Sequence, residues 1–162
     1  MKKVYLDNAS TTAMRPEVIQ VMVDCMAQDY GNPSSTHSLG RHAKSILELS
    51  RKSIAKALNA TAQEILFTSG GTEANNWILR SAVKDLKVRR IISSKMEHHA
   101  VLYPILELQK EFDIQVEYVE NSADGVLDLT HLVDLLSESS EKTLVSLMHV
   151  NNETGVVLDL ER

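Results

Sequence analysis

The sequence predicts an α/β fold with a mostly parallel sheet and helices on both of its faces. From residue 65 onward, apolar runs that suit buried strands alternate with stretches of apolar side chains at helical spacing. This alternation is typical of parallel sheets covered by helices. Polar segments at 68–73, 94–99 and 151–155 follow predicted strands. Because ligands bind beyond the carboxyl ends of parallel strands, we expect these segments to meet at a site.

The size and charge of the chain exclude several classes of protein. Its 162 residues suit one domain, and its hydrophobic content of 43% is ordinary for a globular protein. The net charge of −5 argues against general nucleic-acid binding, which favours a basic face. No apolar run approaches about 18 residues, so the sequence predicts a cytoplasmic protein without a membrane span. Cys25, the single cysteine, lies in an apolar helical pattern and is predicted to be buried.

The first part of the chain is predicted to be mainly helical. Residues 4–6 form a short apolar strand candidate, and a polar loop follows. Residues 16–29 begin with a proline that suits a first helical turn and continue with apolar side chains at helical spacing. The turn-rich stretch 30–37 precedes a longer helix, which is expected to begin near Ser38 and to stop at Asn59.

The second part is predicted to alternate between strands and helices. The strand candidates are rich in β-branched and other apolar residues, and the helix candidates repeat apolar side chains every three or four positions. The predicted strands are 65–67, 90–94, 114–119 and 143–150, and the predicted helices are 74–86, 101–108 and 129–136. A turn is expected at 61–64, and Asp124-Gly125 marks another.

Residues 67–76 carry the strongest local indication of a binding site. Gly70 and Gly71 stand between a predicted strand and a predicted helix, and glycine lets a ligand approach the backbone closely. The free N–H groups and positive dipole end of the helix start favour a phosphate or a carboxylate. A plain strand-to-helix turn explains these residues equally well. The segment has the spacing of neither a dinucleotide fingerprint nor a P-loop.

His98 and His99 offer an acid–base group or a stacking ring near this segment. Adjacent residues at a helix start point in different directions, so we expect only one ring to face the site. A solvent-exposed histidine near a helix N-terminus is an equally good explanation. No metal site is predicted, because no histidine or cysteine pair has a convincing ligand spacing. A cysteine-protease set of Cys25, His98 and Asn152 is disfavoured, because Cys25 is predicted on an apolar helix face.

Five motifs follow one another through nearly the whole chain. They are YLDNASTT at 5–12, GNPSS at 31–35 with His37, FTSGGTE at 67–73, EHHAV at 97–101 and MHVNNETG at 148–155. In this order and spacing they resemble the cysteine desulfurases, which belong to the class V aminotransferase group of fold-type I pyridoxal-phosphate enzymes. The HVNNE form resembles the desulfurases of iron–sulfur cluster assembly more than the other branches.

The resemblance implies a cofactor, a reaction and a set of site residues. Pyridoxal 5'-phosphate would be the cofactor, with Gly71 and Thr72 holding its phosphate. His98, the catalytic residue, would stack on the pyridine ring and assist proton transfers, and Asn152 would lie near the phenolic oxygen. The reaction would take sulfur from L-cysteine, giving L-alanine and an enzyme persulfide. The implied partners are a second copy in a homodimer of the full-length enzyme and a sulfur-acceptor scaffold protein, with no nucleic acid and no membrane.

The resemblance also implies that this chain is the N-terminal portion of such an enzyme, because family members are more than twice as long. Residues 1–15 would join the small domain, and residues 16–162 would form an incomplete cofactor-binding large domain. The family's aspartate partner of the pyridine nitrogen, its Schiff-base lysine and its catalytic cysteine have no counterpart here, since Lys95 and Cys25 do not match them. We therefore expect the chain alone to be inactive. The alternatives are another class V reaction, such as transamination or selenocysteine lysis, and a truncated non-catalytic module that binds partners.

Overall fold

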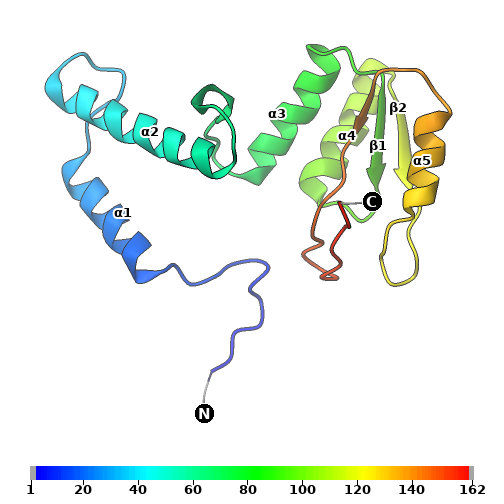
Figure 1. The fold of residues 1–162 in the computed structure, drawn as a ribbon, viewed down its shortest axis with the longest axis horizontal. Helices are drawn as coiled ribbons and strands as arrows, with labels where there is room; N and C mark the ends of the chain where they lie inside the picture. The colour runs from blue at the N-terminus through cyan, green and yellow to red at the C-terminus, as the bar shows by residue number, and fades with distance from the viewer. Residues whose placement is uncertain (1–2, 161–162) are drawn as a thin grey trace. The chain divides into compact units, whose positions relative to one another are not determined.

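The computed structural model describes residues 3–160 and divides the chain into two compact units (Figure 1). The helical unit extends to Phe67, and the sheet unit begins at Thr68. Within the described residues, no helix is both long enough and apolar enough to cross a membrane.

Two helices form most of the helical unit. The helix α1 (Pro16–Gln28) has its proline in the first turn. Proline lacks a backbone N–H, and in the first turn an N–H would have no acceptor within the helix, so no hydrogen bond is lost. The helix α2 (Ser38–Ala57) follows His37, whose ring accepts the N–H of Gly40 at 3.4 Å. The short 3₁₀ helix η1 (Ala62–Glu64) begins with a capping box. Both long helices predicted in this region are confirmed.

Two strands and one buried residue predicted in this unit are not found. Residues 4–6 and 65–67 pair with no segment in the described part of the chain. An apolar run becomes a strand only when a neighbouring segment pairs with its backbone. In the run 65–67, the carbonyl of Ile65 instead accepts a hydrogen bond from the guanidinium of Arg51. Cys25 is exposed, because α1 packs against nothing that buries any of its residues.

The sheet unit alternates helices and strands as the sequence predicts. Its elements are α3 (Gly71–Lys84), β1 (Arg90–Ser94), α4 (His99–Phe112), β2 (Gln115–Val119), α5 (Leu129–Ser137) and β3 (Thr143–Val145). The described strands form a three-stranded sheet in the order β2–β1–β3, and both pairings are parallel. The third strand is shorter than the predicted run 143–150, because the N–H of Met148 bonds the Glu97 carboxylate instead of a strand.

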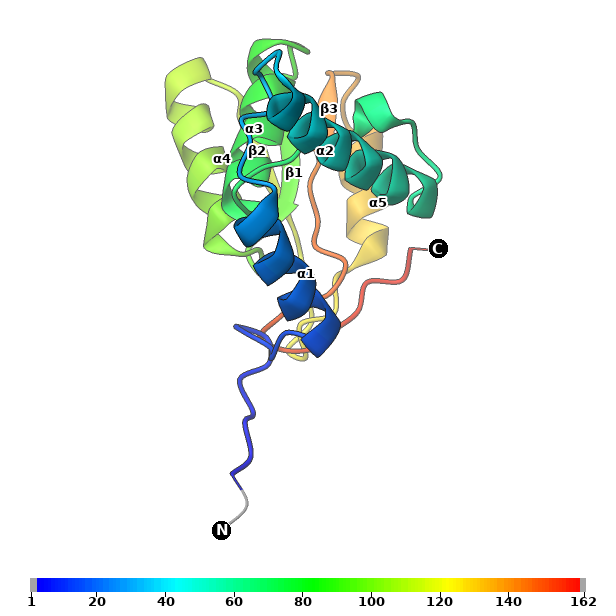
Figure 2. The ribbon, with the colours of Figure 1, turned by 90° about the vertical axis from the view of Figure 1, so that its left-hand side faces the viewer.

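Helices cover both faces of this sheet, and Figure 2 shows α4 and α5 on opposite sides of the strands. Successive strand residues point to opposite faces, so Ile91 packs with α3 and α4 while Ile92 packs with α5. Both side chains are 0% exposed. The α3–α4 face centres on Ile105 and Leu108, and the α5 face on Leu135. The predicted α/β class with helices on both faces is therefore confirmed.

Candidate functional site

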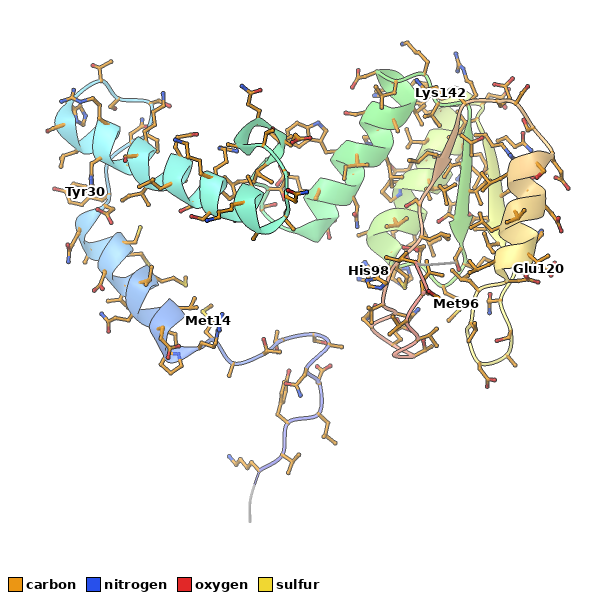
Figure 3. All side chains as sticks on the ribbon, viewed as in Figure 1. Met14, Tyr30, Met96, His98, Glu120 and Lys142 are labelled. Atoms are coloured by element: carbon orange, nitrogen blue, oxygen red, sulfur yellow. The ribbon has the colours of Figure 1, made fainter. Side chains whose placement is uncertain are left out.

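The carboxyl ends of β1 and β3 carry two polar loops, residues 95–98 and 146–155. Figure 3 shows Met96 and His98 at this end of the sheet unit and Lys142 at the opposite end. The loops are joined directly, because the amide nitrogen of Asn151 donates to the carbonyl of Met96 at 3.1 Å. The expected meeting of the segments 94–99 and 151–155 is therefore found.

The N-terminus of α3 is not capped by any described side chain. Gly70 occupies the N-cap position, and the first N–H groups of a helix have no partner within it. Ser69 precedes the N-cap, and its N–H and hydroxyl donate to the Glu73 carboxylate at 2.6 and 2.7 Å. These two hydrogen bonds hold the pKa of Glu73 below its usual range, and the bond from the hydroxyl has the larger effect. A Cβ added at Gly70 or Gly71 would meet nothing within 4 Å, so the approach to this backbone is open.

Thr72 and His98 line the same pocket, which has a volume of about 320 Å³. Residues from the N-terminal parts of α3 and α4 line it. Its lining residues are Thr72 and Asn76 from α3, His98 at the N-cap, and His99, Ala100, Tyr103, Pro104 and Glu107 from α4. This volume falls in the range of small-molecule sites, about 300–1,000 Å³. The structure thus brings together two residues that the sequence singles out separately.

His98 is held in place by the helix that follows it. Its Nδ1 accepts the N–H of Ala100 at 3.0 Å, which makes His98 the N-cap of α4. Because Nδ1 is the acceptor, a neutral ring carries its proton on Nε2. The side chain therefore presents a defined ring orientation and one N–H donor.

His99 also lines this pocket, so the expectation that only one histidine would face it is wrong. The ring of His99 stacks on Tyr103, with centroids 4.9 Å apart and planes 11° from parallel. Two successive residues inside a helix would point their side chains in different directions, but His98 lies outside the helix. His98 has extended backbone angles, φ −61° and ψ 148°, whereas His99 is the first helical residue. This change of conformation places both residues along the pocket, with their ring centroids 6.1 Å apart.

Gly71 and Asn152 do not line this pocket. Gly71 is the first residue of α3, directly before Thr72. Asn152 is exposed in a turn that follows the buried Asn151. The implied roles of Gly71 and Asn152 remain predictions.

Two buried polar residues were not singled out from the sequence. Glu97 is 7% exposed and Asn151 is 8% exposed. Desolvation raises the pKa of the Glu97 carboxyl, against the opposing effects of the Met148 N–H and of His98. A signal was present in the sequence, since each residue directly precedes a predicted site residue. Nothing in the sequence distinguished a buried role from a solvent-exposed one.

Among residues 3–160, no group of three or more histidine, cysteine, aspartate or glutamate side chains is arranged to hold a metal ion. The available groups are a helix start without a side-chain cap, a hydroxyl and two imidazole rings.

Comparison with known proteins identifies the family. The model of the aminotransferase class-V family matches residues 4–162. The chain belongs to the class V aminotransferase family. Among its relatives, a cysteine desulfurase IscS of Dictyoglomus turgidum is 41% identical over 158 residues, and one of Haemophilus ducreyi is 41% identical over 163 residues. The alignments cover 96% and 98% of this class V chain but 39% of each relative, so the chain spans about 39% of the length of these curated relatives.

Solved structures agree with this membership. A NifS-like protein is 36% identical and superposes with a TM-score of 0.90, over 99% of this chain and 44% of that chain. An apo structure of a cysteine desulfurase from Thermococcus onnurineus NA1 is 27% identical, with a TM-score of 0.86, over 98% of this chain and 39% of that chain. The family resemblance and the fold class inferred from the motifs are therefore confirmed.

Proposed function

We propose that this chain forms part of the cofactor-binding region of a pyridoxal-phosphate-dependent cysteine desulfurase. The observation that carries the proposal is the shared pocket of Thr72 and His98 beside the uncapped start of α3. Relatives named cysteine desulfurase, aligned over nearly the whole chain, support the choice of reaction. The enzyme takes sulfur from L-cysteine, giving L-alanine and an enzyme persulfide, and supplies the sulfur to iron–sulfur cluster assembly.

The residues present fit a phosphorylated aromatic cofactor. The free N–H groups and the dipole of the α3 start favour a phosphate, and Thr72 adds a hydroxyl donor. The ring of His98 supplies a flat surface on which a pyridine ring can stack. Thr72, at the start of α3, and the ring of His98 in one pocket of about 320 Å³ suit the two halves of pyridoxal phosphate.

Each proposed site residue has a distinct task. When bound, pyridoxal phosphate supplies an electron sink for bond cleavage in the substrate. Gly71 and Thr72 bind its phosphate and fix its position. His98 orients the ring and holds or transfers a proton at Nε2, since Nδ1 already accepts the N–H of Ala100. Asn152 would hold the phenolic oxygen.

The proposal extends to the division of the chain and to its activity in isolation. Residues 16–162 belong to the cofactor-binding large domain, and residues 1–15 join the small domain. In the sequence no lysine follows a histidine, and Lys95 lies over the ring of Tyr118, with its Nζ 5.9 Å from the centroid. We therefore expect these residues alone not to desulfurate cysteine. A homodimer and a sulfur-acceptor scaffold protein, as partners of the full-length enzyme, belong to the same proposal.

An equilibrium titration with pyridoxal phosphate tests this proposal. The purified chain, Thr72→Ala and the control Thr130→Ala, which removes a hydroxyl from α5, are each titrated and followed by absorbance. Thr72→Ala should weaken binding by about 1 kcal/mol, the contribution of one hydrogen bond, and Thr130→Ala should leave it unchanged. Absence of binding, or equal affinity in all three proteins, would contradict the proposed site.

A further inference from the structure

Glu97 joins the two loops at the carboxyl ends of β1 and β3. It directly precedes His98, the N-cap of α4. Its carboxylate accepts the backbone N–H of Met148, which lies 51 positions later in the sequence. The residue is buried, so water cannot readily replace this hydrogen bond if it is lost. The bond therefore fixes the position of the β3 loop relative to the start of α4.

Asn151 completes the connection from the other side. Its amide nitrogen donates to the carbonyl of Met96, one residue before Glu97. Its amide oxygen accepts the N–H of Glu153 at 2.8 Å and of Thr154 at 2.9 Å. These two bonds close a tight turn around the intervening residue.

That intervening residue is Asn152, and it is exposed. Its position relative to His98 thus depends on the side chains of Glu97 and Asn151. Neither of these side chains lines the pocket that Thr72 and His98 share. Glu97 is the more informative of these side chains, because its length and its charge can be changed separately.

A carboxylate is a costly choice for this position, because desolvation raises the pKa of Glu97. Glutamine has the same length and could accept the same N–H without an ionised group. Aspartate would retain the charge, but it is one methylene shorter and would withdraw the acceptor from Met148. Glu97→Gln keeps the length of the side chain and Glu97→Asp keeps its charge. Comparing them therefore shows whether Glu97 acts through the length of its side chain or through its charge beside His98.

We infer that Glu97 is a positioning residue that holds His98 and the loop carrying Asn152 in one arrangement, so that both can contact the same bound pyridoxal phosphate. The inference rests on the proposed function. Glu97 acts through the Met148 N–H, because its carboxylate is buried and accepts that N–H. The required property is the reach of its side chain.

The test compares Glu97→Gln, Glu97→Asp and Glu97→Ala with the unaltered chain. The control Glu138→Ala removes an exposed carboxylate at the end of α5. Each protein is titrated with pyridoxal phosphate, and its amide proton resonances are recorded by NMR without the cofactor. Thermal unfolding identifies any variant that does not fold.

We expect Glu97→Gln and Glu138→Ala to bind pyridoxal phosphate within about threefold of the unaltered chain, and Glu97→Asp and Glu97→Ala about tenfold more weakly. The Met148 amide proton should keep its hydrogen-bonded shift in Glu97→Gln and lose it in Glu97→Asp. If Glu97→Ala does not fold, the Gln and Asp variants still decide between reach and charge. The opposite order, with Gln weakened and Asp unaffected, would overturn the inference.

The two proposals fail in different ways. Absence of pyridoxal-phosphate binding by the unaltered chain contradicts the proposed function. In that case the cofactor-free spectra still test the role of Glu97. Shifts in the His98 ring and Asn152 resonances in Glu97→Asp, but not in Glu97→Gln, would support positioning. Unchanged resonances of both residues in every variant would contradict it.

Discussion

The two units of this protein differ in how they bury apolar side chains. In the sheet unit, Ile91, Ile92 and Ile105 are each 0% exposed and lie in two clusters, one on each face of the sheet. Among the described residues of the helical unit, the buried apolar ones are Ala43 and Ala55, and no residue of α1 is buried. Both units contain amphipathic helices, so the difference comes from the sheet against which a helix can pack. We therefore expect substitutions in the sheet unit to dominate stability.

The largest contrast is predicted for one isoleucine in each unit. Ile105→Ala leaves a cavity between α4 and the sheet and should lower the free energy of unfolding by about 2–5 kcal/mol. Ile19→Ala on α1, where the side chain is 48% exposed, should change it by no more than about 0.5 kcal/mol. Urea unfolding followed by circular dichroism measures both. Equal losses would show that α1 packs as well as the sheet unit does.

A second contrast compares a tightly packed glycine of the helical unit with an open glycine of the sheet unit. A Cβ at Gly40 would lie 2.4 Å from the carbonyl oxygen of Ser35, whereas one at Gly70 would meet nothing within 4 Å. Gly40→Ala should destabilise the protein by about 1–3 kcal/mol, although alanine ordinarily favours a helix. Gly70→Ala should be nearly neutral. Thermal unfolding checks both, and a stabilised Gly40→Ala would refute the tight packing.

A third contrast concerns helix starts within the sheet unit. The carboxylate of Asp128 accepts the N–H groups of Thr130 and His131 at 2.9 and 3.1 Å, whereas α3 has no such cap among the described side chains. Asp128→Ala should therefore cost about 1 kcal/mol of stability. Asp124→Ala, in the same loop and exposed, is the matched control and should cost less. Equal melting temperatures for the two variants would exclude a capping role for Asp128.

The smallest predicted effect is a dependence on pH from Glu97. Its pKa in the folded protein is raised above the ordinary value of 4.5, so folding favours the protonated carboxyl. The resulting stability is fully present below the unfolded pKa and is lost as the pH rises through the folded pKa. Relative to Glu97→Gln, the unaltered protein should thus lose stability as the pH rises above 4.5. Urea unfolding across this interval tests the sign, and a constant difference between the proteins would contradict it.

The sequence predicted those parts of the fold that local patterns determine. The helices α1 and α2 and the strands β1 and β2 follow from periodicity and composition. The strand predicted at 65–67 failed because strand formation requires a partner, which a local pattern does not contain. The predicted run 143–150 was too long because a buried carboxylate distant in the sequence bonds one of its N–H groups.

The same distinction applies to the candidate site. Thr72 and His98 could be singled out because polar residues at helix starts carry a recognisable local signal. Glu97 and Asn151 could not, because their burial depends on partners 51 and 55 positions away. Side chains that act over such separations become visible only once the loops are placed side by side.

The most direct test of the central claim is to map pyridoxal phosphate onto the chain by NMR. The sheet unit contains other pockets, one of about 300 Å³ whose lining includes Gly125 and Met148 and one of about 540 Å³ whose lining includes Tyr118, so volume alone does not select the location. We predict that the cofactor shifts the amide resonances of Gly71 and Thr72 and the ring resonances of His98. Shifts confined to either of these other pockets would contradict the account.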